Sequence, residues 1–234
     1  MTPAPLHAAG ERLMLDPSGA VFWPARRLLA VADMHLEKAS SAARHGSLLP
    51  PWDTKVTLDR LAALLRRYAP TTVVALGDSF HDRHASLRLQ PHDADRLRAM
   101  TAQAAFVWVL GNHDPLPPDG LGGVAVAEWS VGPMVFRHQA SATARHALEL
   151  CGHHHPKAEI AVRGGKVTRP CFVADPLRLM LPSLGAYTGG LNVRNPAIAR
   201  LFPKGGRLFL LGRDRLFSFP LHELAARAAE LTGM

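Results

Sequence analysis

Three short apolar runs, each followed by polar residues, mark the first half of the chain. They cover residues 27–32, 72–76 and 106–110. Apolar runs of this length that are bounded by polar or turn-forming residues predict buried strands. Between them, residues 53–68 carry apolar side chains at helical spacing, and residues 93–103 fit a second helix. The alternation of strand and helix predicts crossover connections, and therefore an α/β fold with a sheet that is at least partly parallel.

Further elements are predicted at the start of the first helix and in the second half of the chain. Asp53 follows two prolines and is placed to cap that helix. An apolar stretch over residues 135–138 ends at a histidine, and residues 208–211 and 216–219 predict a hairpin around a polar turn. Residues 221–231 predict a last helix that packs back on the sheet.

The composition is that of an ordinary globular protein. With 234 residues and 47% hydrophobic content, one domain is expected over residues 1–234. No apolar run is long enough to span a membrane, and the N-terminus lacks the pattern of a secretory signal, so we expect a cytoplasmic protein without a membrane partner. Cys151 and Cys171 have no metal-binding spacing and are predicted to be small buried residues.

The positive charge of the chain is concentrated in one segment. The formal net charge is +8, and residues 156–215 contain eleven lysines and arginines but only three acids. The rest of the chain is balanced, with 16 bases and 16 acids. This distribution favours a polyanionic partner, either nucleic acid or an anionic membrane surface, and a solvated basic surface is the alternative interpretation.

Candidate chemistry lies where the predicted strands end. In open α/β sheets, ligands bind beyond the carboxyl ends of the strands. Asp33 and His35 follow the first run, Asp78 follows the second, and Asn112 and His113 follow the third. Polar residues after a single strand are typical of any turn. Potential ligands or catalytic residues after three successive strands, however, predict a site at this edge of the sheet.

A second concentration of histidine occurs in the segment CGHHHP, residues 151–156. If the chain is extended there, His153 and His155 project to one side and His154 projects to the other. The two outer histidines are therefore predicted to serve a metal site. His154 is predicted to be a structural or surface residue.

These motifs, in this order, resemble the five motifs of the calcineurin-like metallophosphoesterase family. They span residues 33–155 and comprise Asp33-x-His35, Gly77-Asp78, Gly111-Asn112-His113-Asp114, His138 and Gly152-His153-x-His155. The resemblance implies a four-layered α/β/β/α sandwich with two mixed sheets. More narrowly, residues 32–38 and 181–190 are similar to segments of the bacterial ligase-associated DNA damage response endonucleases.

The family resemblance implies two divalent metal ions per chain. Asp33, His35, Asp78 and His155 would hold one ion, and Asp78, Asn112, His138 and His153 would hold the other. Asp78 would then bridge the two ions. Oxygen and imidazole ligands suit Mn, Fe or Zn. Manganese is favoured because it is usual for nucleases of this family.

The resemblance also implies the chemistry. Two metal ions can generate a bridging hydroxide for in-line attack on a phosphodiester, so no protein nucleophile is needed. His113 would protonate or stabilise the leaving alkoxide. At position 81, where family phosphatases commonly have Asp, this chain has His81, as double-strand-break repair nucleases of the family do. We expect His81 to position His113 or the scissile phosphate, with Asp82 as the alternative.

The function predicted on these grounds is that of a metal-dependent phosphodiesterase, a DNA endonuclease or other nuclease of bacterial DNA repair. Tyr187, which is flanked by glycines, is expected in a substrate-binding loop near the site. The narrower resemblance implies DNA as partner, together with an ATP-dependent DNA ligase and a helicase. A hydrolase of nucleotides or lipid-linked pyrophosphates is the alternative enzyme, and a non-catalytic binding scaffold is a third reading.

Overall fold

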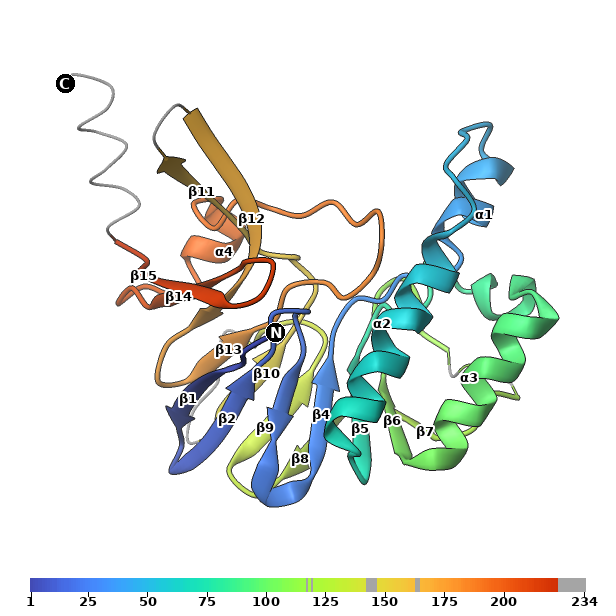
Figure 1. Cartoon of the computed structure of the whole chain (residues 1–234), viewed down its shortest axis with the longest axis horizontal. Helices are drawn as coiled ribbons and strands as arrows, with labels where there is room; N and C mark the ends of the chain where they lie inside the picture. The colour runs from blue at the N-terminus through green and yellow to red at the C-terminus, as the bar shows by residue number, and fades with distance from the viewer. Residues whose placement is uncertain (117, 119, 142–146, 163–164, 223–234) are drawn as a thin grey trace.

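The computed structural model describes residues 1–116, 118, 120–141, 147–162 and 165–222. These residues form two β-sheets that face each other, and helices α2 and α3 cover the outer face of the first sheet (Figure 1). None of the described helices is both long and apolar enough to cross a membrane.

The first sheet has seven strands in sequence order, and its second half is parallel. The pairs from β1 to β4 are antiparallel, and those from β4 to β7 are parallel. The strands are β1 (Ala4–Ala8), β2 (Glu11–Leu15), β3 (Val21–Trp23), β4 (Leu28–Val31), β5 (Thr72–Leu76), β6 (Ala105–Val109) and β7 (Val124–Val126). The helical elements of this half are η1 (Pro24–Arg26), α1 (Lys38–Arg44), α2 (Asp53–Tyr68), η2 (Ala85–Arg88) and α3 (Pro91–Gln103). The first sheet is therefore mixed, as predicted.

The second sheet is also mixed. Its path runs β15-β14-β12-β13-β10-β9-β8, with β11 paired to β12 beside it. Only the β9, β10 and β13 pairings are parallel. The strands are β8 (Glu128–Val131), β9 (Met134–Arg137), β10 (Leu148–Cys151), β11 (Lys157–Val162), β12 (Gly165–Ala174), β13 (Arg178–Met180), β14 (Arg207–Leu211) and β15 (Leu216–Pro220). The short helix α4 (Pro196–Ala199) follows β13.

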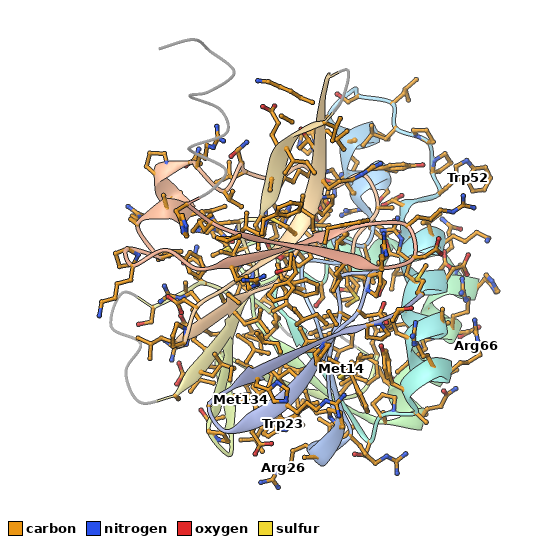
Figure 2. The ribbon with its side chains drawn as sticks, turned by 60° about the vertical axis from the view of Figure 1, so that its left-hand side comes forward. Met14, Trp23, Arg26, Trp52, Arg66 and Met134 are labelled. Carbon is orange, nitrogen blue, oxygen red and sulfur yellow. The ribbon has the colours of Figure 1, made fainter. Side chains whose placement is uncertain are left out.

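Three apolar clusters hold these layers together. Trp23 of the first sheet and Met134 of the second, both labelled in Figure 2, belong to the cluster between the sheets. Leu61 of α2 and Leu97 of α3 pack on the outer face of the first sheet. On the outer face of the second sheet the cover is Ile198 of α4 and neighbouring loop residues. The chain thus forms the predicted α/β/β/α sandwich, with a sparse fourth layer.

Most of the predicted elements are confirmed, with small shifts. The three early strands are β4, β5 and β6, and the predicted hairpin is β14 and β15. Helix α3 begins two residues early, at Pro91, because proline is well suited to the first turn of a helix. Both cysteines are buried and free, as expected. Of the predicted helix 221–231, all but the first two residues lie outside the described residues.

Asp53 does not cap α2 as predicted. It is the first residue of that helix, and its Oδ2 accepts hydrogen bonds from the backbone N–H groups of Lys38 (2.7 Å) and Ala39 (3.2 Å). A carboxylate at a helix N-terminus stabilises the free N–H groups there. Asp53 therefore holds the first turn of α1, which directly follows the predicted metal-binding loop.

The topology brings the predicted motifs to one place. Because β4, β5 and β6 are parallel neighbours, their carboxyl ends lie at the same edge, and Asp33, Asp78 and Asn112 emerge there. In the second sheet β9 and β10 are likewise parallel, and they end directly before His138 and Gly152. The two facing sheets thus deliver all five motifs to a common site.

Candidate metal centre and active site

The loops that carry the predicted ligands have unusual backbone geometry. Five of the seven predicted ligands have positive φ angles: Asp33 (+52°), His35 (+45°), Asp78 (+47°), His153 (+72°) and His155 (+45°). Residues with a Cβ rarely adopt this left-handed conformation, and where it persists the surrounding structure holds it in place. The assumption of an extended chain over residues 151–156 was wrong, since His153 and His155 turn sharply.

Among the described residues, three groups of side chains could hold a metal ion. Asp33, His35 and His155 form the first, and His35, His81 and His113 form a further group that shares His35 with it. The Nε2 atoms of His35 and His155 lie 3.2 Å apart, and His155 Nε2 lies 3.5 Å from Asp33 Oδ1. Asp33 is almost fully buried, and its carboxylate accepts the backbone N–H of His153. The loop of the second sheet is therefore tied directly to the first carboxylate.

Asp78, His138 and His153 form the second group, and Asn112 adjoins it. His138 Nε2 lies 3.4 Å from Asp78 Oδ2, 2.9 Å from Asn112 Oδ1 and 3.1 Å from His153 Nδ1. Asp78 Oδ2 is also 3.8 Å from His35 Nε2 in the first group. Asp78 thus lies between the two groups, where a bridging ligand would stand.

The site is shaped to hold cations. Among the described residues, Asp33 and Asp78 are buried and form no ion pair with lysine or arginine. Buried carboxylates need a partner to offset their desolvation. A Cβ added to Gly111 would stand 2.2 Å from Asp78 Oδ1, and one added to Gly152 would stand 2.5 Å from Asp33 Oδ2. Glycine therefore leaves room for both carboxylates, and the donor set fits two divalent ions that accept oxygen and imidazole ligands.

The protonation states of His35, His153 and Asp78 agree with a ligand role. Burial and the neighbouring His155 lower the pKa of His35 to about 2, and burial with His138 lowers that of His153 to about 4. Burial would raise the pKa of Asp78, but its hydrogen bond and charge interaction with His138 outweigh this and hold the pKa below its usual range. Neutral imidazoles and ionised carboxylates are the forms that bind metals. For His138, burial would lower the pKa, but the hydrogen bond to Asp78 and the charges of Asp33 and Asp78 raise it.

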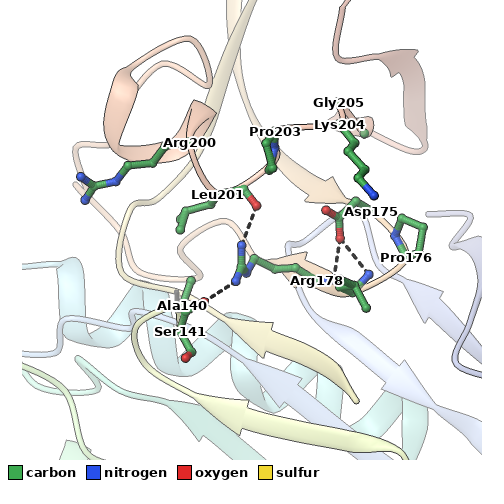
Figure 3. A pocket seen from close by; sticks show the side chains of 12 residues that line it. Ala140, Ser141, Asp175, Pro176, Arg178, Arg200, Leu201, Pro203, Lys204 and Gly205 are labelled. Carbon is green, nitrogen blue, oxygen red and sulfur yellow. Dashed lines mark hydrogen bonds between the residues drawn. The ribbon is translucent and has the colours of Figure 1, made fainter. Parts of the chain in front are cut away.

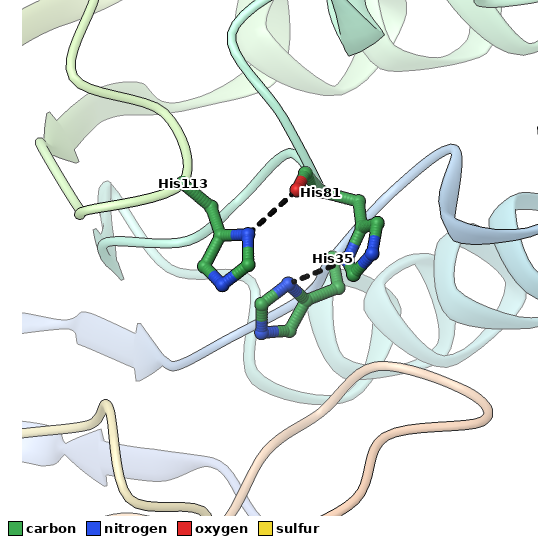
Figure 4. A group of neighbouring side chains, drawn as sticks. All are labelled: His35, His81 and His113. Carbon is green, nitrogen blue, oxygen red and sulfur yellow. Dashed lines mark hydrogen bonds between the residues drawn. The ribbon is translucent and has the colours of Figure 1, made fainter. Parts of the chain in front are cut away.

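His113 is held in place by three contacts. Its backbone N–H donates to Asp78 Oδ1 (2.9 Å), and its Nδ1 lies 2.7 Å from the carbonyl oxygen of His81, to which it must donate. The rings of His81 and His113 stack with centroids 5.2 Å apart (Figure 4). The Nδ1–H bond fixes the tautomer and leaves Nε2 of His113 for proton transfer.

His81, rather than Asp82, is the residue that the structure brings to His113. The Nδ1 of His81 also lies 3.2 Å from Nδ1 of His35, the ring nitrogen that faces away from the first ligand group. Burial, followed by the charges of Lys38 and His113, lowers the pKa of His81 to about 4. The Asp82 carboxylate instead forms a two-fold ion pair with Arg88, which lowers the pKa of Asp82.

Two residues near the site were not given a role from the sequence. The buried Asp114 carboxylate accepts the backbone N–H groups of four residues: Asp78, Ser79, Phe80 and Gly111. Burial raises its pKa to about 6. It fixes the turn that presents Asp78. In the sequence, only the position of Asp114 beside Asn112 and His113 indicated a role at the site. The second residue is Gln139, whose Nε2 lies 3.0 Å from His153 Nε2, and no sequence pattern indicated its role.

His154 and Tyr187 lie outside the two ligand groups. His154 belongs to neither ligand group, and its half-buried ring packs on that of His153 with centroids 4.7 Å apart. Tyr187 is 44% exposed in the loop between β13 and α4. That loop lies against the site, because Cβ atoms at Gly185 and Gly190 would stand 2.3 Å from the Met34 oxygen and 2.2 Å from the His155 oxygen.

The basic segment is not one continuous charged surface. The buried Arg178 forms an ion pair with Glu149 (2.5 Å) and donates to the carbonyl oxygens of Leu201 and Ser141. It lines a cavity of about 830 Å³ together with Arg200 and Lys204 (Figure 3). Of the aromatic residues interleaved with these bases, Phe172, Phe202 and Phe209 are buried in the core, and Tyr187 and Phe217 are exposed.

Two facing mixed sheets with this set of imidazoles and carboxylates at the strand ends define a metallophosphoesterase. Residues 26–175 match the model of the calcineurin-like phosphoesterases. The chain belongs to the calcineurin-like phosphoesterase family and is a metal-dependent phosphoesterase.

Solved structures are similar to the chain over most of its length. The nuclease MPE of Pseudomonas putida is 30% identical, with a TM-score of 0.72, over 93% of this chain and 100% of that one. The phosphoesterase Yfce of E. coli is 15% identical, with a TM-score of 0.42, over 83% of this chain and 98% of its own. No curated protein matches the chain.

Proposed function

We propose that this protein is a dimetal phosphodiesterase that cleaves DNA in bacterial DNA repair. The observation that carries the proposal is the position of Asp78 between His35 of the first ligand group and His138 of the second. The same carboxylate accepts a hydrogen bond from the backbone N–H of His113. The likeness to a nuclease over almost the whole chain supports nucleic acid as the substrate class. The surplus of bases over residues 156–215 adds attraction for a polyanion.

The residues divide the proposed work between them. Asp33, His35 and His155 would hold one divalent ion, and Asn112, His138 and His153 would hold the other, with Asp78 shared. Such a pair can clamp a phosphate, activate water and stabilise the entering and leaving oxygens of an in-line displacement. We propose manganese as the metal, with iron or zinc as alternatives.

His113 is proposed as the general acid. Because its Nδ1–H is held by the His81 carbonyl, Nε2 is the nitrogen that can donate a proton to the leaving alkoxide. His81 acts as a positioning residue, since its backbone orients His113 and its ring contacts His35. No serine or cysteine nucleophile is needed, and both cysteines are buried, which raises their pKa values.

We place this activity in the cytoplasm. An ATP-dependent DNA ligase and a helicase are proposed partners, on the strength of the sequence resemblance over residues 32–38 and 181–190.

The test compares DNA with a small diester. Protein loaded with manganese is incubated with end-labelled linear single-stranded DNA, circular single-stranded DNA or bis-p-nitrophenyl phosphate, beside a His113→Ala variant. We expect cleavage of DNA and of the small diester, and a loss of roughly 100- to 10,000-fold in the variant for DNA. Cleavage of the circle would show endonucleolytic attack.

Two results would contradict the proposal. If DNA remains intact while the small diester or a nucleotide pyrophosphate is hydrolysed, the protein is a small-molecule phosphoesterase. If the protein binds no divalent ion and hydrolyses nothing, it is a binding scaffold. The complete set of ligand side chains argues against the scaffold.

A further inference from the structure

A basic groove adjoins the metal centre under the loop that carries Tyr187. It has a volume of about 490 Å³, and among the described residues that line it there are three cations, Arg60 of α2, Lys157 of β11 and Arg213 of the β14–β15 turn, and no carboxylate. Tyr187 also lines it. We call this feature the Tyr187 groove. Its composition is that of a site for an anion with an apolar, planar part.

The groove and the metal centre share their walls. Ser183, which lines the groove, donates its hydroxyl hydrogen to the Asp33 carbonyl oxygen, and the backbone N–H of Gly185 donates to the same oxygen (3.2 Å). Lys157 follows His155 by two residues, and its Nζ lies 3.4 Å from the Thr188 carbonyl oxygen. The groove and the metal centre are therefore neighbours on the two sides of the backbone that carries Asp33.

The positive charges of the groove are not neutralised by the protein. Among the described residues, Arg60, Lys157 and Arg213 form no ion pair, whereas Lys55 of the same helix α2 pairs with Asp59 at 3.0 Å. Within the described part of the chain, Arg60 donates to the Leu184 carbonyl oxygen (2.7 Å). The Oγ atom of Ser18, also in the groove, is buried without a hydrogen-bond partner in the described chain.

A fourth cation lies on the chain segment that follows His35. Lys38 lies three residues after His35, at the start of α1, and its backbone N–H donates to Asp53 Oδ2 at 2.7 Å. Burial lowers the pKa of its side chain, the nearby charge of Asp53 raises it and that of Lys157 lowers it. Lys38 thus adds positive charge near Lys157, which favours a polyanion.

Tyr187 is held in a position that favours a ligand contact. Its φ angle is +59°, which is costly for a residue with a Cβ, and 44% of its surface is exposed. The other tyrosine of the chain, Tyr68, is packed against Phe22 and hydrogen-bonded to Asp16. An exposed aromatic ring beside unpaired cations is the arrangement with which proteins stack bases of single strands.

We propose that the Tyr187 groove binds the nucleic-acid strand on one side of the scissile phosphodiester. Tyr187 stacks on an unpaired base, Lys157 and Arg213 contact backbone phosphates, and Arg60 adds positive charge beneath them. This inference rests on the proposed function. The cavity of Figure 3 is a poorer candidate, because Arg178 there is neutralised by Glu149 and Asp175 contributes a further negative charge.

The test separates the groove from the metal centre. Four variants are compared with wild type: Tyr187→Ala, Tyr187→Phe, Arg213→Ala and, as the matched control, Lys204→Ala. Lys204 belongs to the same basic segment but lines the other cavity. Alanine and phenylalanine both carry a Cβ, so both variants have the same backbone strain at the positive φ angle of position 187. The comparison of the two variants therefore isolates the aromatic ring. For each protein kcat/KM is measured with a fluorescein-labelled oligothymidylate and with bis-p-nitrophenyl phosphate.

The expected result is a selective loss with DNA. Tyr187→Ala should lower kcat/KM for the oligonucleotide by roughly five- to 150-fold, the factor of one base–aromatic stack, and far less for the small diester. Tyr187→Phe should retain most of the wild-type kcat/KM for the oligonucleotide, because the ring is kept. The affinity for the same labelled oligonucleotide is also measured at several salt concentrations. Arg213→Ala should reduce the slope of log affinity against log salt by about 0.7, the value for one phosphate contact to a single strand.

Two outcomes would overturn the inference, and they differ. If wild type hydrolyses the small diester and no DNA, the proposed function fails and the groove proposal fails with it. If wild type cleaves DNA but Tyr187→Ala and Arg213→Ala behave like Lys204→Ala, the groove proposal alone is wrong. An equal loss in Tyr187→Ala and Tyr187→Phe would also contradict base stacking.

Discussion

Replacement of Gly152 by alanine tests whether the position of the Asp33 carboxylate controls the site. The new Cβ would stand 2.5 Å from Asp33 Oδ2 and 3.0 Å from the Ala32 Cβ. Ordinary contact begins at 3.4 Å, so the carboxylate must move by about 0.9 Å. Gly152 has no positive φ, and the substitution therefore acts through this contact and not through backbone strain.

A shift of this size is expected to be costly. Asp33 accepts the His153 N–H and lies 3.5 Å from His155 Nε2, so its movement disturbs ligands from both sheets. Displacement by about 1 Å can cost roughly 100-fold in rate, which corresponds to about 2.7 kcal/mol of transition-state stabilisation. We also expect the manganese concentration for half-maximal activity to rise roughly 10- to 100-fold.

The assay is hydrolysis of bis-p-nitrophenyl phosphate as a function of manganese concentration. Gly189→Ala is the matched control, because a Cβ there meets no atom within 4 Å and the residue has no positive φ. Thermal unfolding verifies that both variants fold. If Gly152→Ala shows the same rate and the same manganese midpoint as Gly189→Ala, the position of the Asp33 carboxylate does not control metal binding or the rate of hydrolysis.

Two further substitutions test other parts of the structure. Arg178→Met breaks the buried ion pair with Glu149 and should lower the free energy of unfolding in urea by about 3 kcal/mol. This value is the low end for a broken buried pair, because Glu149 still has Arg137 as a partner at 3.4 Å. An unchanged unfolding midpoint would contradict this expectation. His81→Ala keeps the carbonyl oxygen that orients His113 but removes the ring that stacks on His113 and contacts His35. It should therefore lower diester hydrolysis much more than Asp82→Asn, since the Asp82 carboxylate is engaged by Arg88. A larger loss in Asp82→Asn would make Asp82 the residue that assists His113.

Three neighbouring strands of the first sheet and helices α2 and α3 were predictable because local patterns determine them, whereas β1, β2, β3 and β7 were not predicted. Apolar runs of five or six residues, separated by a periodic helical segment, were sufficient for β4, β5 and β6. The second sheet was accessible only in part. Local patterns predicted β9 and the hairpin of β14 and β15, but β10 and β13 are short and are defined by partners far away in the sequence. The assembly of these strands into one mixed sheet was implied only by the family resemblance.

The same contrast applies to the site. Asp33, Asp78 and Asn112 follow parallel strands, so their convergence follows from topology alone. The conformation of residues 153–155 could not be deduced from side-chain alternation, because left-handed φ angles at His153 and His155 break that periodicity. Charge counting likewise could not distinguish Arg178, which is neutralised by Glu149, from Arg213, which forms no ion pair among the described residues.

Anomalous diffraction from crystals grown with manganese shows whether the site holds two metal ions, because it locates the ions without reference to any substrate. Two anomalous peaks per chain are expected. One lies among Asp33, His35 and His155, the other lies among Asn112, His138 and His153, and Asp78 lies between them. A single peak, or manganese found only at surface carboxylates, would contradict a dimetal centre and the phosphodiester chemistry derived from it.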